Sequence, residues 1–315
     1  MTIQWYPGHM HKAQKEIKQA LPDIDLIIEV VDARIPYSSA NPVIADLAEN
    51  KGISKPIIKL MNKTDLADPA RTAQWCEYLE KQQGVKALPV TAQSPEQVKK
   101  VIGLCRRLAP QRTTKELPVR AMIMGIPNVG KSTIINILSQ KTIAKVGNEP
   151  AVTQRQQRID LKEGVILFDT PGILWPKIDN THSSYRLAIS GAIKDTALDY
   201  EDVAFYAIEY LLKNYQSLLA EHFKLDEHEL ASYQSESWMA LELIGRLRGC
   251  LKAGGRIDMD KVCKILIHEY RAGNIGKITL ESPAMIEKEL IEVAEMLKQK
   301  AEKKAARKAG FKKKR

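Results

Sequence analysis

Apolar and polar positions alternate along the first 180 residues in a regular way: short apolar runs end in polar loops, and amphipathic stretches separate most of these runs. The expected strands are 26–33, 56–66, 85–90, 119–124, 155–161 and 164–168, and the expected helices are 9–21, 41–50, 69–83, 95–108 and 132–138. This alternation predicts an α/β fold with a mostly parallel sheet and helices on both of its faces.

Beyond position 180 the strand pattern gives way to helical spacing. Apolar residues recur at such spacing from Trp238 to Leu251, and Val262, Ile265 and Leu266 continue it in a second helix. Basic residues decorate both helices: Arg246, Arg248, Lys252, Arg256, Lys261, Lys264, Arg271 and Lys277. We therefore expect an α/β domain at 1–179, an all-α C-terminal domain at 180–285 and a helical or disordered basic tail at 286–315.

The charge of the chain is concentrated in that tail. The net charge is +10, and the last 18 residues hold ten Lys or Arg against one acid, so that +9 of it lies there. A run of this kind is either a solvated end or an arm that binds a polyanion such as RNA. The remaining residues together carry a net charge of only +1.

The composition indicates in which compartment of the cell the protein is expected. No apolar run approaches the roughly 18 residues that cross a membrane, and the first residues lack the apolar core of a signal peptide. The four cysteines have no C-x-x-C spacing, which favours reduced thiols over a disulfide framework or a zinc site. We expect a cytoplasmic protein without membrane contact, monomeric when it is not bound to a larger partner.

The sequence GIPNVGKS at 125–132 fits the phosphate-binding loop pattern G-x-x-x-x-G-K-[ST], and it lies between an expected strand and an expected helix. Backbone N–H groups of such a loop surround phosphate oxygens at a helix N-terminus. Lys131 would reach the β- and γ-phosphates, and Ser132 would bind magnesium. The expected nucleotide contacts here are Asn128, Val129, Gly130, Lys131, Ser132 and Thr133. A glycine turn with a solvated lysine is the alternative.

Asn62-Lys63-Thr64-Asp65, at the end of the strand 56–66, is typical of a guanine-binding loop. The carboxylate of Asp65 would accept two hydrogen bonds from guanine, a pair that adenine does not offer. Asn62 would hold the loop, and the stem of Lys63 would cover the base. An ordinary turn has the same residues, but a second base-binding loop is expected after the next strand, at Thr91, Ala92 and Gln93.

Asp169-Thr170-Pro171-Gly172 follows the last expected strand of the sheet. Asp169 would hold magnesium through water, and the Gly172 N–H would contact the γ-phosphate. Thr153 is the candidate switch threonine that ligates magnesium, with Thr142 as its rival. Three motifs that agree on one chemistry make a chance match improbable.

The order of these motifs is unusual, because the guanine loop precedes the phosphate loop and Asp169 to Gly172 closes the domain. A circular permutation, with 109–118 joining the usual ends, accounts for this order. Domain termini commonly lie close together at the surface, so such a permutation is tolerated. The γ-phosphate-sensing loop then leads directly into the helical domain.

With these motifs the chain resembles the circularly permuted GTPases, and among them the ribosome biogenesis GTPase A family. The matching stretches are WYPGHMHKA, VVDARIP, NKTD, GIPNVGKS, DTPGI and GGRIDMDKVCKILIHEYRAGNIGKITLE. The resemblance implies a factor that hydrolyses GTP to GDP and phosphate in late assembly of the large ribosomal subunit. It also implies that the helical domain contacts ribosomal RNA.

Hydrolysis needs a group that orients water, and the position after DTPG holds Ile173, which cannot hydrogen-bond through its side chain. His9, His182 or a potassium ion could supply the help. The resemblance favours His9 as the catalytic residue, beside Lys131, and links Asn128 with potassium ligation. A non-hydrolytic, nucleotide-toggled RNA-binding or scaffold protein is the alternative function; a P-loop kinase that uses ATP is disfavoured because NKTD would have no task.

Overall fold

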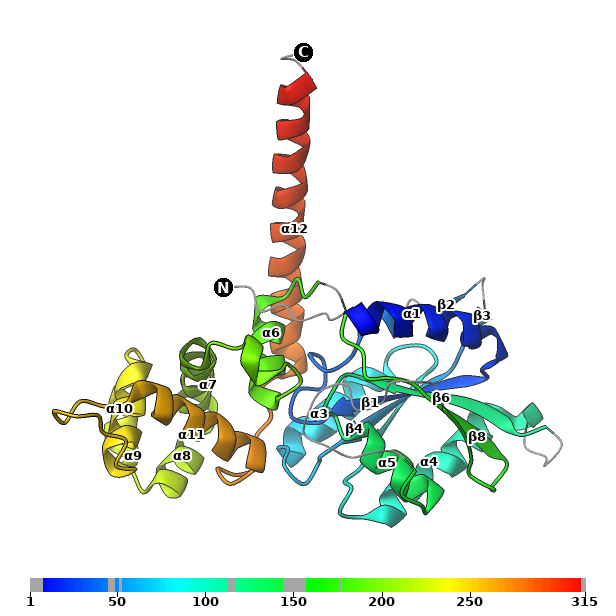
Figure 1. The fold of residues 1–315 in the computed structure, drawn as a ribbon, viewed down its shortest axis with the longest axis horizontal. Coiled ribbons are helices and arrows are strands. Elements are labelled where there is room, and N and C mark those ends of the chain that lie inside the picture. The colour runs from blue at the N-terminus through cyan, green and yellow to red at the C-terminus, as the bar shows by residue number, and fades with distance from the viewer. Residues whose placement is uncertain are drawn as a thin grey trace.

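The computed structural model describes residues 8–44, 49–50, 53–112, 117–143, 157–175 and 177–312. In Figure 1, a sheet flanked by helices stands beside a separate group of helices, and one long helix projects from the body. The expected fold class, a mostly parallel α/β domain followed by helices, is therefore confirmed.

Within the described residues the sheet has six strands, in the order β5-β4-β1-β6-β8-β7. Their bounds are β1 (Leu26–Asp32), β4 (Ile57–Asn62), β5 (Val85–Pro89), β6 (Val119–Gly125), β7 (Gln157–Asp160) and β8 (Val165–Asp169). Every neighbouring pair is parallel except β7 with β8. All residues of β1 and β4 are buried, as is typical of central strands covered on both faces.

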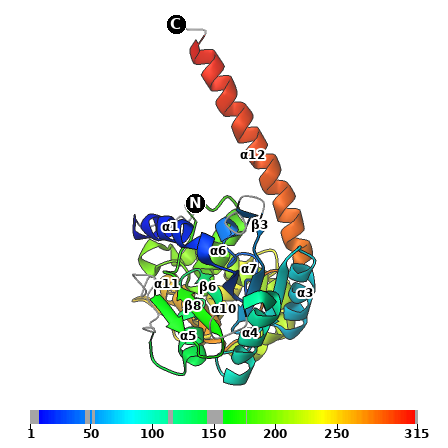
Figure 2. The same cartoon turned by 90° about the vertical axis from the view of Figure 1, so that its right-hand side faces the viewer.

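Helices cover both faces of this sheet. Figures 1 and 2 show α1 (Gly8–Ala20) on one face and α4 (Pro95–Leu108) with α5 (Lys131–Ser139) on the other. The buried residues of α4 are Val98, Val101, Ile102 and Cys105, an apolar stripe at helical spacing. The helix α3 (Pro69–Glu80) packs beside β5 and is capped at its start by Asp68.

The parallel register places the functional loops at one edge. Asp32 is the partner of Asn62, and Val30 is the partner of Gly125, so that β1 separates the guanine loop from the phosphate loop by one strand. On the other side of β6, Ile123 pairs with Asp169. The carboxyl ends of these strands meet at the same edge, where ligands of open α/β sheets bind.

Two expected elements are wrong in part. Of the helix expected at 41–50, residues 42–44 are helical, but Glu49–Asn50 is β2, antiparallel to β3 (Ile53–Ser54). Short apolar segments such as 41–50 do not distinguish a helix from a strand by their period.

Leu251 does not belong to the helix that contains Trp238. The helix α10 (Ser237–Leu247) ends earlier, where Gly249 adopts a left-handed conformation with φ of 61°. Leu251 instead forms an isolated bridge with Ile257.

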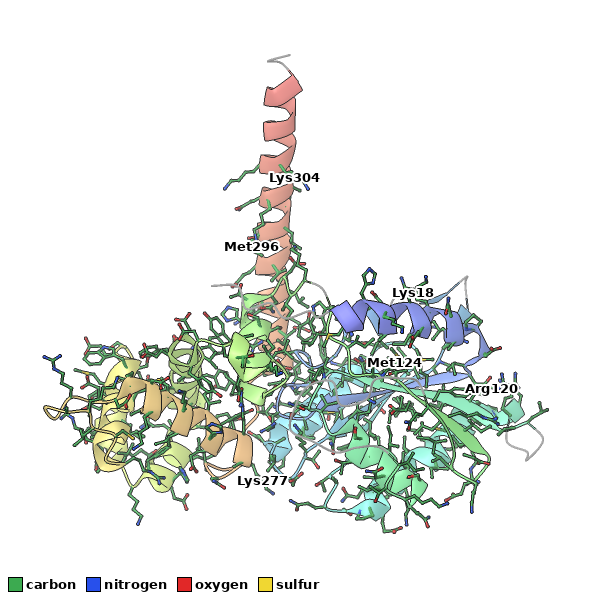
Figure 3. All side chains as sticks on the ribbon, in the orientation of Figure 1. Lys18, Arg120, Met124, Lys277, Met296 and Lys304 are labelled. Carbon is green, nitrogen blue, oxygen red and sulfur yellow. The ribbon has the colours of Figure 1, made fainter. Side chains whose placement is uncertain are left out.

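The remaining elements are helical. They are α6 (Thr181–Ser190), α7 (Tyr200–Asn214), α8 (Gln216–Phe223), α9 (Glu227–Ser232), α11 (Met259–Ala272) and α12 (Pro283–Lys312), with 3-10 turns at Leu21–Asp23, Pro110–Arg112 and Asp195–Ala197. Figure 3 places Met296 and Lys304 on the part of α12 that leaves the body. Within the described ranges, no helix is long and apolar enough to cross a membrane.

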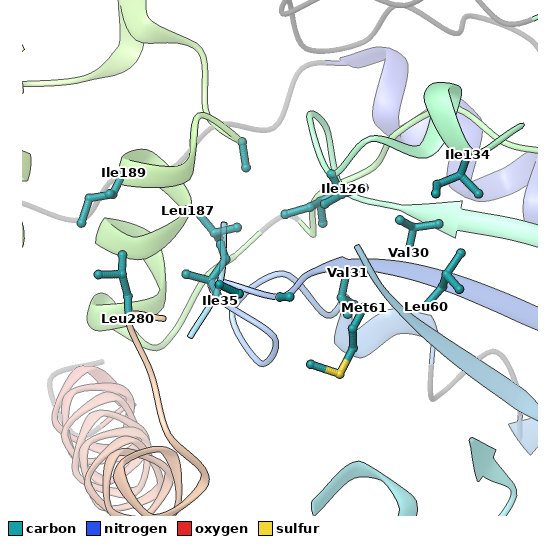
Figure 4. Close-up of a cluster of buried hydrophobic side chains, with 14 of the residues drawn as sticks. Val30, Val31, Ile35, Leu60, Met61, Ile126, Ile134, Leu187, Ile189 and Leu280 are labelled. Atoms are coloured by element: carbon teal, nitrogen blue, oxygen red, sulfur yellow. The ribbon is translucent and has the colours of Figure 1, made fainter. Parts of the chain in front are cut away.

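The sheet and the first helix after it share a buried core. Figure 4 shows this cluster running from Val30 and Leu60 in the sheet, past Ile35 in the loop after β1, to Leu187 and Ile189 in α6. All five side chains are buried. The helical region is thus packed against the sheet rather than tethered to it.

A buried ionic cluster reinforces this junction. Arg186 of α6 pairs with Glu289 of α12, and its Nη1 lies 3.5 Å from Oε2 of Glu281. Glu281 also accepts hydrogen bonds from the backbone N–H groups of Tyr37 and Ser38, in the loop after β1. Burial raises the pKa of Glu281; at Glu289 burial has the same sense, but pairing with Arg186 outweighs it and the pKa falls.

Candidate functional site

The loop between β6 and α5 has the geometry of a phosphate cradle. Gly130 has φ of 88°, and a Cβ at this position would lie 2.3 Å from Nδ2 of Asn62. A Cβ on Gly125 would lie 2.8 Å from the carbonyl oxygen of Val30. Both positions therefore require glycine, one for its backbone conformation and both for space. Because α5 begins at Lys131, the N–H groups of Ser132 and its neighbours sit at a helix N-terminus, where anions are favoured.

Lys131 and Asp169 form a buried ion pair across this loop. Their side chains are 6% and 0% exposed. Burial lowers the pKa of Lys131 and raises that of Asp169, and in both cases their mutual attraction opposes the shift. Among the described residues, Oδ2 of Asp169 is buried without a hydrogen-bond partner. A buried carboxylate oxygen in this situation fits a hydrated magnesium ion, the role expected from the sequence.

Asn62 and Lys63 join the guanine loop to the phosphate loop. Asn62 Nδ2 donates to the carbonyl oxygen of Val129 at 2.8 Å, and Lys63 Nζ donates to that of Asn128 at 2.7 Å. Lys63 has φ of 65°, a left-handed conformation that is uncommon for residues other than glycine. Oδ1 of Asn62 is a second buried atom for which the described residues supply no partner.

Asp65 is held by the second base-binding loop. Its Oδ1 accepts from Thr91 Oγ1 at 2.7 Å, and its Oδ2 accepts from Gln93 Nε2 at 3.0 Å. Ala92 lies between these two partners in sequence. The structure thus gathers both predicted base-binding loops around one carboxylate, because β4 and β5 are parallel neighbours.

Two further residues at this edge were not predicted as part of the site. Asp32, at the end of β1, accepts from Lys63 Nζ at 2.8 Å and pairs with Arg34 at 2.9 Å. Burial alone would raise the pKa of Asp32, but the charges of Arg34 and Lys63 outweigh it and hold that pKa well below its ordinary value. The sequence offered one signal for Asp32: it ends a buried strand, and that strand lies beside the strand that carries NKTD.

The segment that contains Gly172 lies directly against the phosphate loop. A Cβ on Gly172 would come within 3.3 Å of the backbone nitrogen of Pro127. Thr170 Oγ1 donates to the carbonyl oxygen of Ile123 at 2.9 Å, which fixes the strand end. Ile173 is 3% exposed, so this side chain is part of the core and does not face water.

Asn128 links the phosphate loop to the helical region. Its Nδ2 donates to the carbonyl oxygen of Gly191, at the end of α6, at 2.6 Å. Next to this contact, a cavity of ≈ 560 Å³ lies between the two parts of the chain, and its walls include Arg34, Lys63, Lys194 and Arg271. The loop that is expected to bind phosphate therefore also contacts the helices.

The remaining candidates are the switch threonine and the histidine that would orient water. Thr153 lies outside the described residues, and its rival Thr142 is exposed. His9 belongs to the first turn of α1, but its side chain is not among those described. His182 is the second residue of α6; its N–H donates to Oδ1 of Asn180, and its ring lies 5.7 Å from the Tyr206 ring. The assignment of a water-orienting histidine stays a prediction.

Comparison with known proteins agrees with this geometry. A family model described as "50S ribosome-binding GTPase" matches residues 120–242. Ribosome biogenesis GTPase A of Priestia megaterium is 43% identical over 298 residues, which span 92% of this chain and 100% of that protein.

Two solved structures are similar over most of the chain. The GDP-bound structure of TM YlqF has a TM-score of 0.58 at 27% identity and covers 85% of this chain and 99% of that one. The GNP-bound structure of YlqF from T. maritima has a TM-score of 0.57 at 27% identity and covers 86% and 98%. The resemblance expected from the motifs is confirmed, and the chain belongs to the ribosome biogenesis GTPase A family of circularly permuted GTP hydrolases.

Proposed function

We propose that this GTP hydrolase acts in late assembly of the large ribosomal subunit and that it turns over GTP while it is docked on the subunit precursor. The description of the matching family model, a 50S ribosome-binding GTPase, supports this partner. The observation that carries the proposal has two sides. Ile173 stands at the position where a group must orient water, but it is buried. In contrast, the basic helix α12 projects from the body (Figure 1). In this proposal, the partner that binds this helix also brings into place the group that orients the attacking water.

Ribosomal RNA is the component that we propose the helical part and the tail contact. The outer part of α12 carries Lys298, Lys300, Lys303 and Lys304, which are exposed and repeat on a helix free of the body. Such an array is suited to phosphate contacts. Arg271 does not join this surface, because its guanidinium donates to the carbonyl oxygens of Ile189 and Ala188 at the junction.

Nucleotide binding is assigned to four loops at the sheet edge. Asn62, Lys63 and Asp65, with Thr91 to Gln93, bind guanine, and residues 128–133 with Gly172 bind the phosphates. Magnesium is held by Ser132, Asp169 and Thr153, and it neutralises charge on the phosphate oxygens. Potassium is assigned to Asn128, whose amide oxygen is the ligand atom. The chain is proposed to divide into 1–179, 180–285 and 286–315, and to be a cytoplasmic monomer away from the ribosome.

The test is a multiple-turnover phosphate-release assay with and without purified large ribosomal subunits, in potassium and in sodium buffer. Stimulation by the subunit is expected, and completion of a GTPase site by a partner reaches about 10⁵-fold in known systems. His9→Ala should lower kcat far more than GTP affinity, because a water-orienting group acts mainly in the transition state. Equal rates with and without subunits would contradict the proposal; stimulation that survives His9→Ala would retain the partner and reject the residue.

A further inference from the structure

The backbone immediately after the DTPG motif is fixed at one residue from two sides. The N–H of Ile173 donates to the carbonyl oxygen of Gly125 at 3.2 Å, and its carbonyl oxygen accepts from Asn41 Nδ2 at 3.1 Å. Ile173 and Asn41 are each 3% exposed, so water does not compete well for either bond. The peptide that follows Gly172 is therefore tied both to the first glycine of the phosphate loop and to Asn41.

The orientation of the Asn41 amide follows from its partners. Its Oδ1 accepts from the backbone N–H of Val43 at 3.0 Å, while its Nδ2 faces the Ile173 carbonyl oxygen. Exchanging the two amide atoms would pair donor with donor and acceptor with acceptor, so only one orientation satisfies both neighbours. Asn41 thus acts as a donor toward the DTPG segment.

Asn41 is itself anchored to the centre of the sheet. Its backbone N–H donates to Oε1 of Glu29 at 2.6 Å. Glu29 is 0% exposed in the middle of β1, and its other carboxylate oxygen pairs with Lys59 of β4. A continuous series of buried polar contacts therefore runs from Lys59 through Glu29 and Asn41 to Ile173, and such a fully bonded series is rigid.

We infer that Asn41 is a positioning residue for GTP hydrolysis. It touches no reacting atom in this arrangement; it holds the Ile173 carbonyl, and so the adjoining Gly172 N–H, in place relative to the phosphate loop. The inference rests on the proposed role of the Gly172 N–H at the γ-phosphate. It gives the buried amide of Asn41 a task, and it gives Asn41 no part in binding GDP.

The test uses Asn41→Asp in the full-length chain. The carboxylate keeps the acceptor for the Val43 N–H but presents an acceptor, in place of a donor, to the Ile173 carbonyl oxygen. We expect kcat for GTP to fall about 10- to 100-fold, the scale of a displacement of about 1 Å at a reacting group. The affinity for GDP should stay within about twofold, since charge compensation of its phosphates by Lys131 is untouched. The ratio of affinities for a non-hydrolysable GTP analogue and for GDP should fall as well.

The matched control is Asn274→Asp, which removes an amide donor at an exposed position of the helical region, where Nδ2 donates to Glu269 at 2.9 Å. Its turnover and its affinity ratio should equal those of the wild type. Asn41→Ser keeps an oxygen that can accept from the Val43 N–H, but its side chain is too short to reach Ile173. It should behave like Asn41→Asp. Because serine is uncharged, this variant also shows that the effect of Asn41→Asp does not come from the added charge.

Three results would overturn the inference: unchanged kcat in Asn41→Asp, a parallel fall of GDP and analogue affinity, or wild-type values in Asn41→Ser. A wild type without turnover would refute the proposed hydrolytic cycle instead. In that case the affinity ratio alone decides whether Asn41 positions the γ-phosphate-sensing segment, so the two failures remain distinguishable.

Discussion

Replacing Arg186 by Met should destabilise the protein strongly, because Arg186 is the only cation among the described residues that contacts Glu281 and Glu289 together. Arg186 is 1% exposed and Glu281 is 0% exposed, so the loss leaves a carboxylate away from water. Removing one partner of a buried ion pair costs about 3–5 kcal/mol. The hydrogen bonds from Tyr37 and Ser38 remain, so we expect the lower part of this range.

The effect should depend on pH in a defined direction. Burial raises the pKa of Glu281 above its ordinary value, and the charge of Arg186 opposes that rise, so the pKa should rise further in Arg186→Met. This added penalty is fully present above the raised pKa of the variant and disappears as the pH falls toward the ordinary carboxyl pKa and Glu281 binds a proton. The difference in the free energy of unfolding between wild type and variant should therefore be largest near pH 8 and smaller near pH 5.

Urea unfolding followed by circular dichroism at both pH values measures this difference. The control is Arg246→Met, which breaks an exposed pair with Glu242 one helical turn away and should cost no more than about 0.5 kcal/mol. Similar losses in the two variants, or a loss for Arg186→Met that does not shrink at the lower pH, would refute the buried ionic cluster as a determinant of stability.

Three further predictions concern the ligands. Asp65→Asn should weaken GTP binding about 10- to 100-fold and favour xanthosine triphosphate, measured by isothermal titration, because an amide donates where the carboxylate accepts; unchanged GTP affinity would remove Asp65 from the base site. Lys131→Ala should weaken GTP binding by a similar factor, since a charge-assisted contact to phosphate is lost and Asp169 is left without its buried partner; normal turnover would reject the phosphate-loop assignment. Deleting 298–315 should flatten the salt dependence of RNA binding, by about 0.7 in log–log slope for each lost phosphate contact; an unaltered slope would leave the tail without an RNA-binding role.

The sequence alone determined those features that short segments encode. The phosphate loop, the guanine loop and DTPG are read from residues that are adjacent in the chain, and each follows an apolar strand whose type is clear from its period. The order of the three loops also required no structure, since it revealed the permuted topology directly. The helix at 95–108 was predicted to the residue, because Pro95 begins it and its apolar stripe is regular.

The contacts that join these segments were decided only by tertiary structure. Asn41 meets Ile173 across 132 positions, and Asn128 meets Gly191 across 63. No local pattern marks such pairs, because each depends on how the crossovers stack the strands and on which helix then covers the sheet edge. The same holds for Asp32, whose pKa is lowered by Arg34 nearby and by Lys63, which directly follows the neighbouring strand β4. Hydrogen-bonding capacity is a property of each residue type, but the partner that satisfies it is set by the packing of the whole chain.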